Sequence, residues 1–244
     1  MLSSVLLSLL IGVVLSANAQ SPQYVLWNHP HAQNIPTIHQ SAVQARRILN
    51  LSSIATLSTV FPQDQSATML ENRPPNLGGA PIGLIDYYAS CDPTPHEPTI
   101  LAISIATSFK NARAGSNVTL SLRYHPPLDH PSGDDIYTYS PANLPRFSLL
   151  GYIEPVSASE VKKHHVDRCF FATHPDAVAW KPGNAIHQSW WARLVVQHVY
   201  WIGGFGDRAY IGWIPVEEWR GVSQEEVKSA RLVGEHGYEA AAST

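Results

Sequence analysis

The sequence contains twelve histidines, and their spacing decides whether they could form a metal site. A tetrahedral zinc site needs three or four ligands that converge on one point. His164 and His165 are adjacent, so on a helix their side chains project about 100° apart. His29 and His31 lie in a proline-rich segment, and neither a Cys-x-x-Cys nor a His-x-x-x-His pair occurs. The sequence therefore predicts no metal centre.

Hydrolytic catalysis has no recognisable set of residues either. A serine nucleophile on a strained turn would be indicated by Gly-x-Ser-x-Gly, which is missing from the sequence. Cys169 and His174 lie five residues apart, a spacing that does not place two side chains on one helix face. Asp86 and Glu154 are single acids in predicted strands, without visible partners. No hydrolase site is therefore predicted.

Two other features could serve a ligand or the protein itself. Arg193 shares a predicted strand face with Trp191 and Val195, so it could bind a ligand phosphate or form an ion pair. A block of aromatic residues could stack a planar ligand or supply core and dimer contacts, since large aromatic side chains dominate both. Its members are Trp190, Trp191, Tyr200, Trp201, Phe205, Tyr210 and Trp213.

The amino terminus predicts export. Residues 5–15 form a largely apolar stretch, too short for the roughly 20 residues that span a bilayer. The small residues Ala17 and Ala19 follow, which indicates a signal peptide over 1–19 with cleavage between Ala19 and Gln20. No later segment approaches bilayer length, so we expect no membrane insertion after cleavage.

Export changes the meaning of two other motifs. Cys91 and Cys169 would meet an oxidising compartment, where they could form a disulfide or remain two separate buried thiols. Asn50 and Asn117 begin Asn-x-Ser/Thr sequons, so they are candidate glycosylation sites. The sequence places the protein in the secretory pathway, with the extracellular space or an endolysosomal or vacuolar lumen as its destination.

The remaining chain is predicted to be mainly β and to form one domain. A net charge of −3 and a pI near 6.4 provide no basic face for nucleic acid. An extended arm is expected over 20–36, the domain over 37–222, and a short helix and tail over 223–244. Capping boxes predict helices over 37–49 and 157–171, and a short helical turn is expected at 174–180. Strands are predicted near 53–60, 80–88, 99–107, 117–124, 146–154, 190–202 and 208–214, where β-branched runs alternate with turn residues. This pattern is typical of a small antiparallel barrel or a sandwich.

Several blocks, in order, resemble the CREG family of secreted or endolysosomal glycoproteins, named as cellular repressors of gene expression. They are Ala45-Arg46-Arg47-Ile48 with Ser53–Thr59, Gly79–Gly83, Cys169–Asp176 before Trp180, and Trp201–Gly206 with Ile214–Glu218. The resemblance covers about residues 40–220. It implies the pyridoxamine-phosphate-oxidase-like fold, a six- to seven-stranded antiparallel Greek-key split barrel with a few peripheral helices, which binds FMN in its flavin-dependent members and forms dimers.

The resemblance also identifies a candidate flavin site. In flavin-binding relatives, basic and hydroxyl side chains after the third strand hold the phosphate, and here residues 107–113 occupy that turn. The candidate FMN contacts are Ser108, Lys110, Asn111 and Arg113; alternatively, Lys110 and Arg113 simply lie on a solvated turn. The oxidases end in an Arg-Leu-His-Asp-Arg-like segment, whereas this chain has Arg231-Leu232-Val233-Gly234.

The expected function is therefore that of a CREG-like, non-catalytic homodimer that acts by interaction with an unidentified protein or receptor. No cofactor is expected, because CREG proteins are regarded as flavin-free versions of the fold. The alternative is an FMN-dependent oxidoreductase, and a weaker alternative is a haem-binding split barrel, since the wider superfamily includes haem proteins.

Overall fold

The computed structural model describes residues 35–63, 73–127, 140–206 and 208–235. The signal peptide, its cleavage site at Ala19 and Gln20, and nearly all of the 20–36 arm lie outside these residues. In chain order the elements are α1 (Ile38–Leu51), β1 (Ile54–Val60), β2 (Pro81–Tyr87), β3 (Thr99–Ile103), α3 (Thr107–Arg113), β4 (Val118–Arg123), β5 (Arg146–Pro155), α4 (Ala158–His164), α5 (Val166–Thr173), η2 (Pro175–Trp180), β6 (Ser189–Ile202), β7 (Ile211–Ile214), α6 (Val216–Gly221) and α7 (Gln224–Ser229). None of the described helices is long and apolar enough to cross a membrane.

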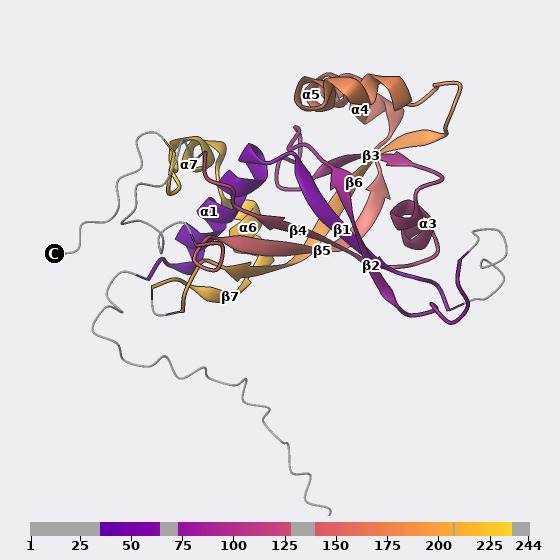
Figure 1. Ribbon diagram of the computed structural model, residues 1–244. Coiled ribbons are helices and arrows are strands. Elements are labelled where there is room, and N and C mark those ends of the chain that lie inside the picture. The colour runs from indigo at the N-terminus through magenta and orange to yellow at the C-terminus, as the bar shows by residue number, and fades with distance from the viewer. Residues whose placement is uncertain (1–34, 64–72, 128–139, 207, 236–244) are drawn as a thin grey trace, which may run out of the picture.

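The seven strands form one antiparallel sheet that curls into a barrel (Figure 1). The strand order is β2-β1-β4-β5-β6-β3, with β7 paired to β6 as a branch. An isolated bridge between Ala89, just after β2, and Thr99 of β3 joins the two ends of this path. The barrel is thus closed at one end of β2 and β3 and open along the rest of their length. This confirms the predicted split-barrel class.

Strand β6 is long enough to pair with different partners along its length. Its first residues pair with β3, residues 192–202 follow β5, and its last residues pair with β7. The register with β5 shifts between Leu150 and Gly151, which bends the ribbon. A Cβ on Gly151 would lie 1.8 Å from the carbonyl oxygen of Val195, so only glycine allows this close approach.

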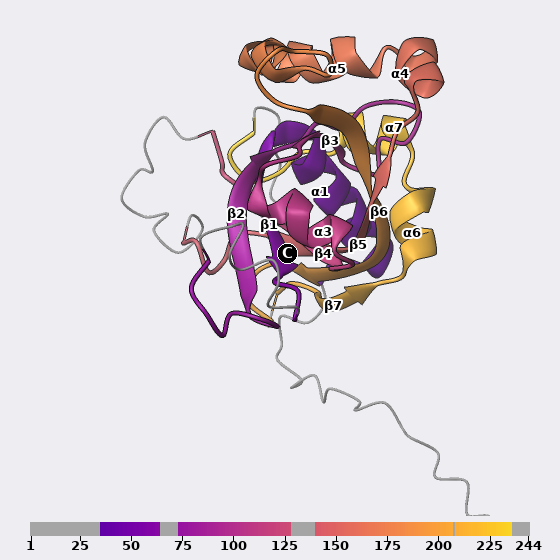
Figure 2. The same cartoon turned by 90° about the vertical axis from the view of Figure 1, so that its right-hand side faces the viewer.

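Two helices close the ends of the barrel, as the view along it shows (Figure 2). Thr37 is the N-cap of helix α1, and its side chain accepts from the Gln40 amide in a capping box. Its apolar face, which includes Ala42, Ala45 and Ile48, is fully buried in the main core. Helix α3 lies at the opposite end, and α6 and α7 pack on α1 from outside.

A second layer covers the outer side of β3 and the first half of β6. Helices α4 and α5 form this layer, and η2 follows them (Figure 1). Beneath them Leu101, Phe170 and Trp191 form a second, smaller core. A disulfide joins Cys91, which follows β2, to Cys169 on α5, with Cα atoms 5.9 Å apart. Of the two alternatives that the sequence left open, the structure has the bridge.

Two predicted elements were wrong in extent. The strand predicted over 99–107 ends at Ile103, because the chain turns there and starts α3 at Thr107. The single helix predicted over 157–171 is two helices, since His165 takes a left-handed conformation (φ 51°) that ends α4.

Candidate functional site

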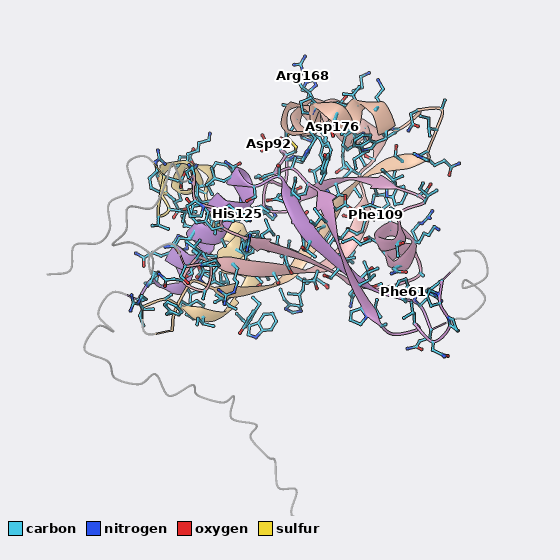
Figure 3. The ribbon with its side chains drawn as sticks, viewed as in Figure 1. Phe61, Asp92, Phe109, His125, Arg168 and Asp176 are labelled. Atoms are coloured by element: carbon cyan, nitrogen blue, oxygen red, sulfur yellow. A yellow bond between two sulfur atoms is a disulfide. The ribbon has the colours of Figure 1, made fainter. Side chains whose placement is uncertain are left out.

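The residues that would hold a flavin phosphate lie on a helix and not, as predicted, on a turn. Helix α3 spans Thr107–Arg113 and connects β3 to β4 at the open end of the barrel. Figure 3 shows Phe109 on this helix; its ring is 1% exposed and packs edge-on against Trp190. The helix is therefore a packed plug of the barrel, and its sides face different environments.

Ser108 and Asn111 face the protein interior. They are three residues apart, so they share one side of the helix, and they are 2% and 1% exposed. The Asn111 amide donates to the hydroxyl oxygen of Thr59 on β1 at 3.0 Å. This hydrogen bond satisfies a buried polar group and ties α3 to the barrel wall. Of the four predicted phosphate contacts, Asn111 thus has a structural role and Ser108 is buried.

Lys110 and Arg113 share the other side of the helix, toward the surface. Arg113 is exposed, and its guanidinium donates to the carbonyl oxygen of Ser104 at 2.8 Å. The same guanidinium lies over the ring of Trp190, 5.4 Å from the centroid. Both contacts hold the Arg113 side chain against residues outside α3, one just after β3 and one at the start of β6.

These four side chains do not converge on a phosphate. A phosphate requires cationic and neutral donors around one point. Here the neutral donors Ser108 and Asn111 lie inside, while the cations Lys110 and Arg113 lie on the opposite side of the same helix. The arrangement suits a barrel plug better than a mononucleotide cradle.

Arg193 forms ion pairs, which answers the question that the sequence left open. Its Nε lies 2.9 Å from Glu154 on the neighbouring strand and 3.7 Å from Glu97. Its Nη1 lies 3.4 Å from Glu160 on α4. Burial raises the pKa of Glu97, and the nearby charge of Arg193 opposes that rise. The cluster fastens the α4 layer to the sheet.

Two histidines of the described residues serve an ion pair and the packing of the core. His39 on α1 contacts Glu218 and Glu226 at 2.9 and 2.7 Å, and these hydrogen bonds raise its pKa. His174 is buried, bonds the Tyr88 carbonyl and stacks on a tyrosine ring. Within the described ranges no group of three or more metal-ligating side chains occurs. Cys169 is in the disulfide and is not a free nucleophile.

The aromatic block is divided between the core and an exposed face. Trp191 and Trp201 are 8% and 0% exposed. Trp213 on β7 is 55% exposed, and its ring lies 5.0 Å from that of Tyr200 on β6. The core interpretation holds for the first pair, while the second pair lies on an outer face of the sheet.

That outer face carries a continuous row of side chains that the sequence analysis missed. Cross-strand pairing aligns one residue from each of six strands, Ile85, Thr56, Ser121, Ser148, Tyr200 and Trp213. A groove of about 400 Å³ lies along it, lined by the four central members of the row and by Arg123, Arg146 and other neighbours. The row is polar in the middle and ends in Ile85, 75% exposed, and Trp213. Alternation indicates which residues point outward, but their alignment depends on strand registers that no local pattern contains.

Asp86 is a partly buried acid, and no counter-charge contributes to the shift of its pKa. It lies on β2 opposite Ala55, on the inner side of the sheet. Its carboxylate accepts from the Tyr87 amide at 2.9 Å. Burial raises the pKa of Asp86 to about 6, against its ordinary 3.8. The predicted strand position was right, and the raised pKa predicts that the stability of the fold depends on pH.

Comparison with protein families gives one match that covers most of the chain. The model described as CREG, beta-barrel matches residues 36–221. A search among curated proteins finds no match.

Solved structures share the fold at low sequence identity. A heme binding protein from Mycobacterium smegmatis is 17% identical with a TM-score of 0.53, covering 76% of this chain and 61% of that protein. The protein Atu2129 of unknown function from Agrobacterium tumefaciens is 18% identical with a TM-score of 0.50, covering 78% and 63%. The chain thus spans about three-fifths of the length of each. A FAD and heme binding protein from Mycobacterium smegmatis has 12% identity, 78% coverage of both chains and a TM-score of 0.39.

Proposed function

Because this chain belongs to the CREG beta-barrel family, we propose that it is an exported glycoprotein that acts as a non-catalytic dimer by binding another protein. The observation that carries the proposal is the division of α3. Ser108 and Asn111 are buried in the plug, and Arg113 is held on a carbonyl oxygen and the Trp190 ring. These groups of α3 serve the packing of the barrel and do not converge on one point for a phosphate. We therefore assign the function to surfaces that bind another protein.

A flavin titration tests this proposal directly. The mature protein is titrated with FMN, and quenching of flavin fluorescence is followed for wild type, Lys110→Ala and the exposed-lysine control Lys162→Ala. We expect a flat titration for all three. Saturable binding at about micromolar Kd, lost only in Lys110→Ala, would establish the oxidoreductase alternative instead.

An absorbance spectrum of protein purified from a native host covers the haem alternative. One solved structure with this fold is that of a heme binding protein from Mycobacterium smegmatis, which motivates the control. Flavin and haem both absorb visible light, whereas a barrel without a cofactor does not. We expect no visible absorbance; a Soret band that stays with the protein through purification would favour the haem alternative.

The dimer is assigned to the uncovered outer face. Its row ends in two large exposed apolar side chains, Ile85 and Trp213, and a two-fold contact would bury both. We expect a dimer with an interface above about 1,000 Å². In light scattering, Trp213→Glu should shift the protein to monomer. Ile186→Glu, which replaces an apolar side chain by the same acid at a 77% exposed loop position, should not. A wild-type monomer at micromolar concentration refutes the dimer.

Export and glycosylation form the remaining part of the proposal. Asn50 at the end of α1 and Asn117 before β4 are both exposed, as an acceptor must be. We expect the exported protein to begin at Gln20 and to lose mass on endoglycosidase treatment. Mass spectrometry that finds Met1 retained contradicts the proposed cleavage. If the wild type and the Asn50→Gln and Asn117→Gln variants all lose no mass on this treatment, the proposed glycosylation is wrong.

A further inference from the structure

One histidine of helix α1 contacts both of the helices that follow β7. Figure 1 shows α1, α6 and α7 grouped at the same end of the barrel, away from α3. His39 lies in the first turn of α1, and its ring stands between Glu218 of α6 and Glu226 of α7. The ring Nδ1 is 2.9 Å from Glu218 Oε2, and the ring Nε2 is 2.7 Å from Glu226 Oε1. A single side chain thus connects three helices.

The two contacts of His39 need a ring that carries two protons. An ionised carboxylate accepts hydrogen bonds and donates none, and a neutral imidazole has a single N–H. If His39 were neutral, one ring nitrogen would therefore turn a lone pair toward a carboxylate oxygen. Glu226 stays ionised, because its hydrogen bonds with His39 and Ser223 lower its pKa to about 2. Wherever both glutamates are ionised, these distances require the imidazolium form of His39.

The carboxylate of Glu226 is held in position through its other oxygen. Glu226 Oε2 accepts from the Ser223 amide and from the Ser223 hydroxyl, both at 2.8 Å. These bonds belong to the capping box that begins α7. Because Oε1 contacts His39, the link to α1 lies at the first turn of α7. Loss of this link would therefore loosen α7 at its beginning.

Other contacts between these helices do not titrate near neutral pH. Arg46 donates to the Trp219 carbonyl oxygen at 3.0 Å, and Arg47 donates to the Val227 carbonyl oxygen at 3.4 Å. Arginine keeps its charge throughout this range. The Val227 side chain is 2% exposed and packs in the main core. These contacts hold the helices together at every neutral pH, and His39 adds a contribution that depends on pH.

The charges around His39 favour its protonated form. The hydrogen bonds with Glu226 and then Glu218 raise the pKa of His39 above its ordinary 6.5, against a smaller opposing effect of burial. Among the described residues, no other charge is a cause of this shift. Strand β7, which also packs on α1, carries no titratable side chain. The remaining charged side chains on the elements that pack together here are Arg46, Arg47, Arg123, Glu217, Arg220, Glu225 and Lys228. A raised pKa gives a stabilisation that is complete below the ordinary value and is lost as pH rises through the folded-state pKa.

We propose that His39 is a pH-dependent fastening of the two C-terminal helices. As imidazolium it donates to Glu218 and Glu226 together and keeps the start of α7 on α1. When the ring loses one proton to solvent, one of the two hydrogen bonds is lost, and α7 opens locally more often. The chain after α7 packs on the barrel, where Tyr124 donates to the Val233 carbonyl oxygen at 2.9 Å. This end of the barrel is therefore closed more firmly at acidic pH than at alkaline pH.

Side-chain NMR of the ¹⁵N-labelled mature protein measures the protonation of His39. We expect both ring nitrogens to be protonated at about pH 6, and the pKa to lie above the ordinary 6.5. Glu226→Gln should lower this pKa, since glutamine preserves the capping box but carries no charge. Glu225→Gln, which removes the adjacent exposed acid, should change the pKa much less. A neutral His39 at about pH 6, or equal effects of the two variants, overturns the proposal.

Hydrogen exchange of peptides from residues 216–235 measures the local opening, at about pH 6 and about pH 8, with a correction for the intrinsic effect of pH on exchange. In wild type, opening should be about three- to tenfold more frequent at the higher pH, the contribution of two exposed ion pairs. His39→Gln should open equally often at both pH values. His165→Asn, which replaces an exposed histidine at a left-handed position that asparagine tolerates, should behave as wild type. Opening that is independent of pH in wild type, or a pH dependence that persists in His39→Gln, contradicts the fastening.

Discussion

Replacing Asp86 with asparagine should stabilise the protein at neutral pH, and the gain should disappear on acidification. The inner side of β2 shields this carboxylate partly from water, and the carboxylate accepts a hydrogen bond from the Tyr87 amide. Asparagine has the same shape and keeps an oxygen to accept that bond. The substitution therefore removes the buried charge and little else.

The magnitude follows from the pKa. The folded-state pKa of Asp86 is about 6 and its ordinary value is 3.8, so between these pH values the folded protein binds more protons than the unfolded chain. Stability contributed by this group therefore falls as pH rises through that window. The charge costs about 3 kcal/mol at pH 7, about 1.6 kcal/mol at pH 5 and about 0.6 kcal/mol at pH 4. Roughly half of this cost is therefore gone at pH 5 and most of it at pH 4.

Urea unfolding of the oxidised protein at pH 4, 5, 6 and 7 measures the difference between wild type and Asp86→Asn. The subtraction cancels other titrating groups such as His39, provided that they lie far from the substitution. Asp167→Asn, which removes an exposed acid on α5, is the matched control. A variant less stable than wild type at pH 7, or a stabilisation that does not change with pH, would refute the reasoning.

Three further variants test contacts that hold the barrel together, and the free energy of unfolding is measured for each. Replacing Cys91 and Cys169 with serine removes a disulfide that closes a loop with a sequence separation of 78. The free energy of unfolding in urea should be about 4 kcal/mol lower than that of the oxidised wild type. Gly151→Ala should cost about 3 kcal/mol or more, because its Cβ meets a backbone oxygen, while Gly221→Ala, with open space around it, should be neutral by thermal melting. Arg193→Met leaves a buried carboxylate without its partner and should cost about 2 kcal/mol, with a smaller loss at acidic pH.

Much of the fold was predictable because local patterns and tertiary burial agree. In β4, Val118, Leu120 and Leu122 alternate with polar residues, and they are the residues that the barrel buries. Helix α1 was predicted from a capping box and an apolar face, and both are present. Where one face of a strand or helix meets the core, the spacing of apolar residues in the sequence indicates where that element lies in the chain.

Helix α3 was missed because its stability does not come from its own sequence. It has seven residues, its N-cap is Ala106, and no side chain caps it. Isolated helices of this length are unstable in water, so burial of Phe109 and Asn111 in the barrel end must hold it. Likewise, whether Cys91 meets Cys169 depends on how α5 packs over the sheet, which neither cysteine's neighbours encode.

The placement of α3 also bears on where function can lie. The buried donors Ser108 and Asn111 lie on one side of α3, and the cations of this helix lie on the other side. The outer side of the sheet is divided too. The disulfide-fastened layer of α4 and α5 covers the part over β3, while the row from Ile85 to Trp213 has no such cover among the described elements. An exposed tryptophan and isoleucine at the two ends of a polar groove are what a second protein surface would cover. One part of the outer side is therefore covered by the chain itself, and the other part is the surface that we assign to the second copy in the dimer.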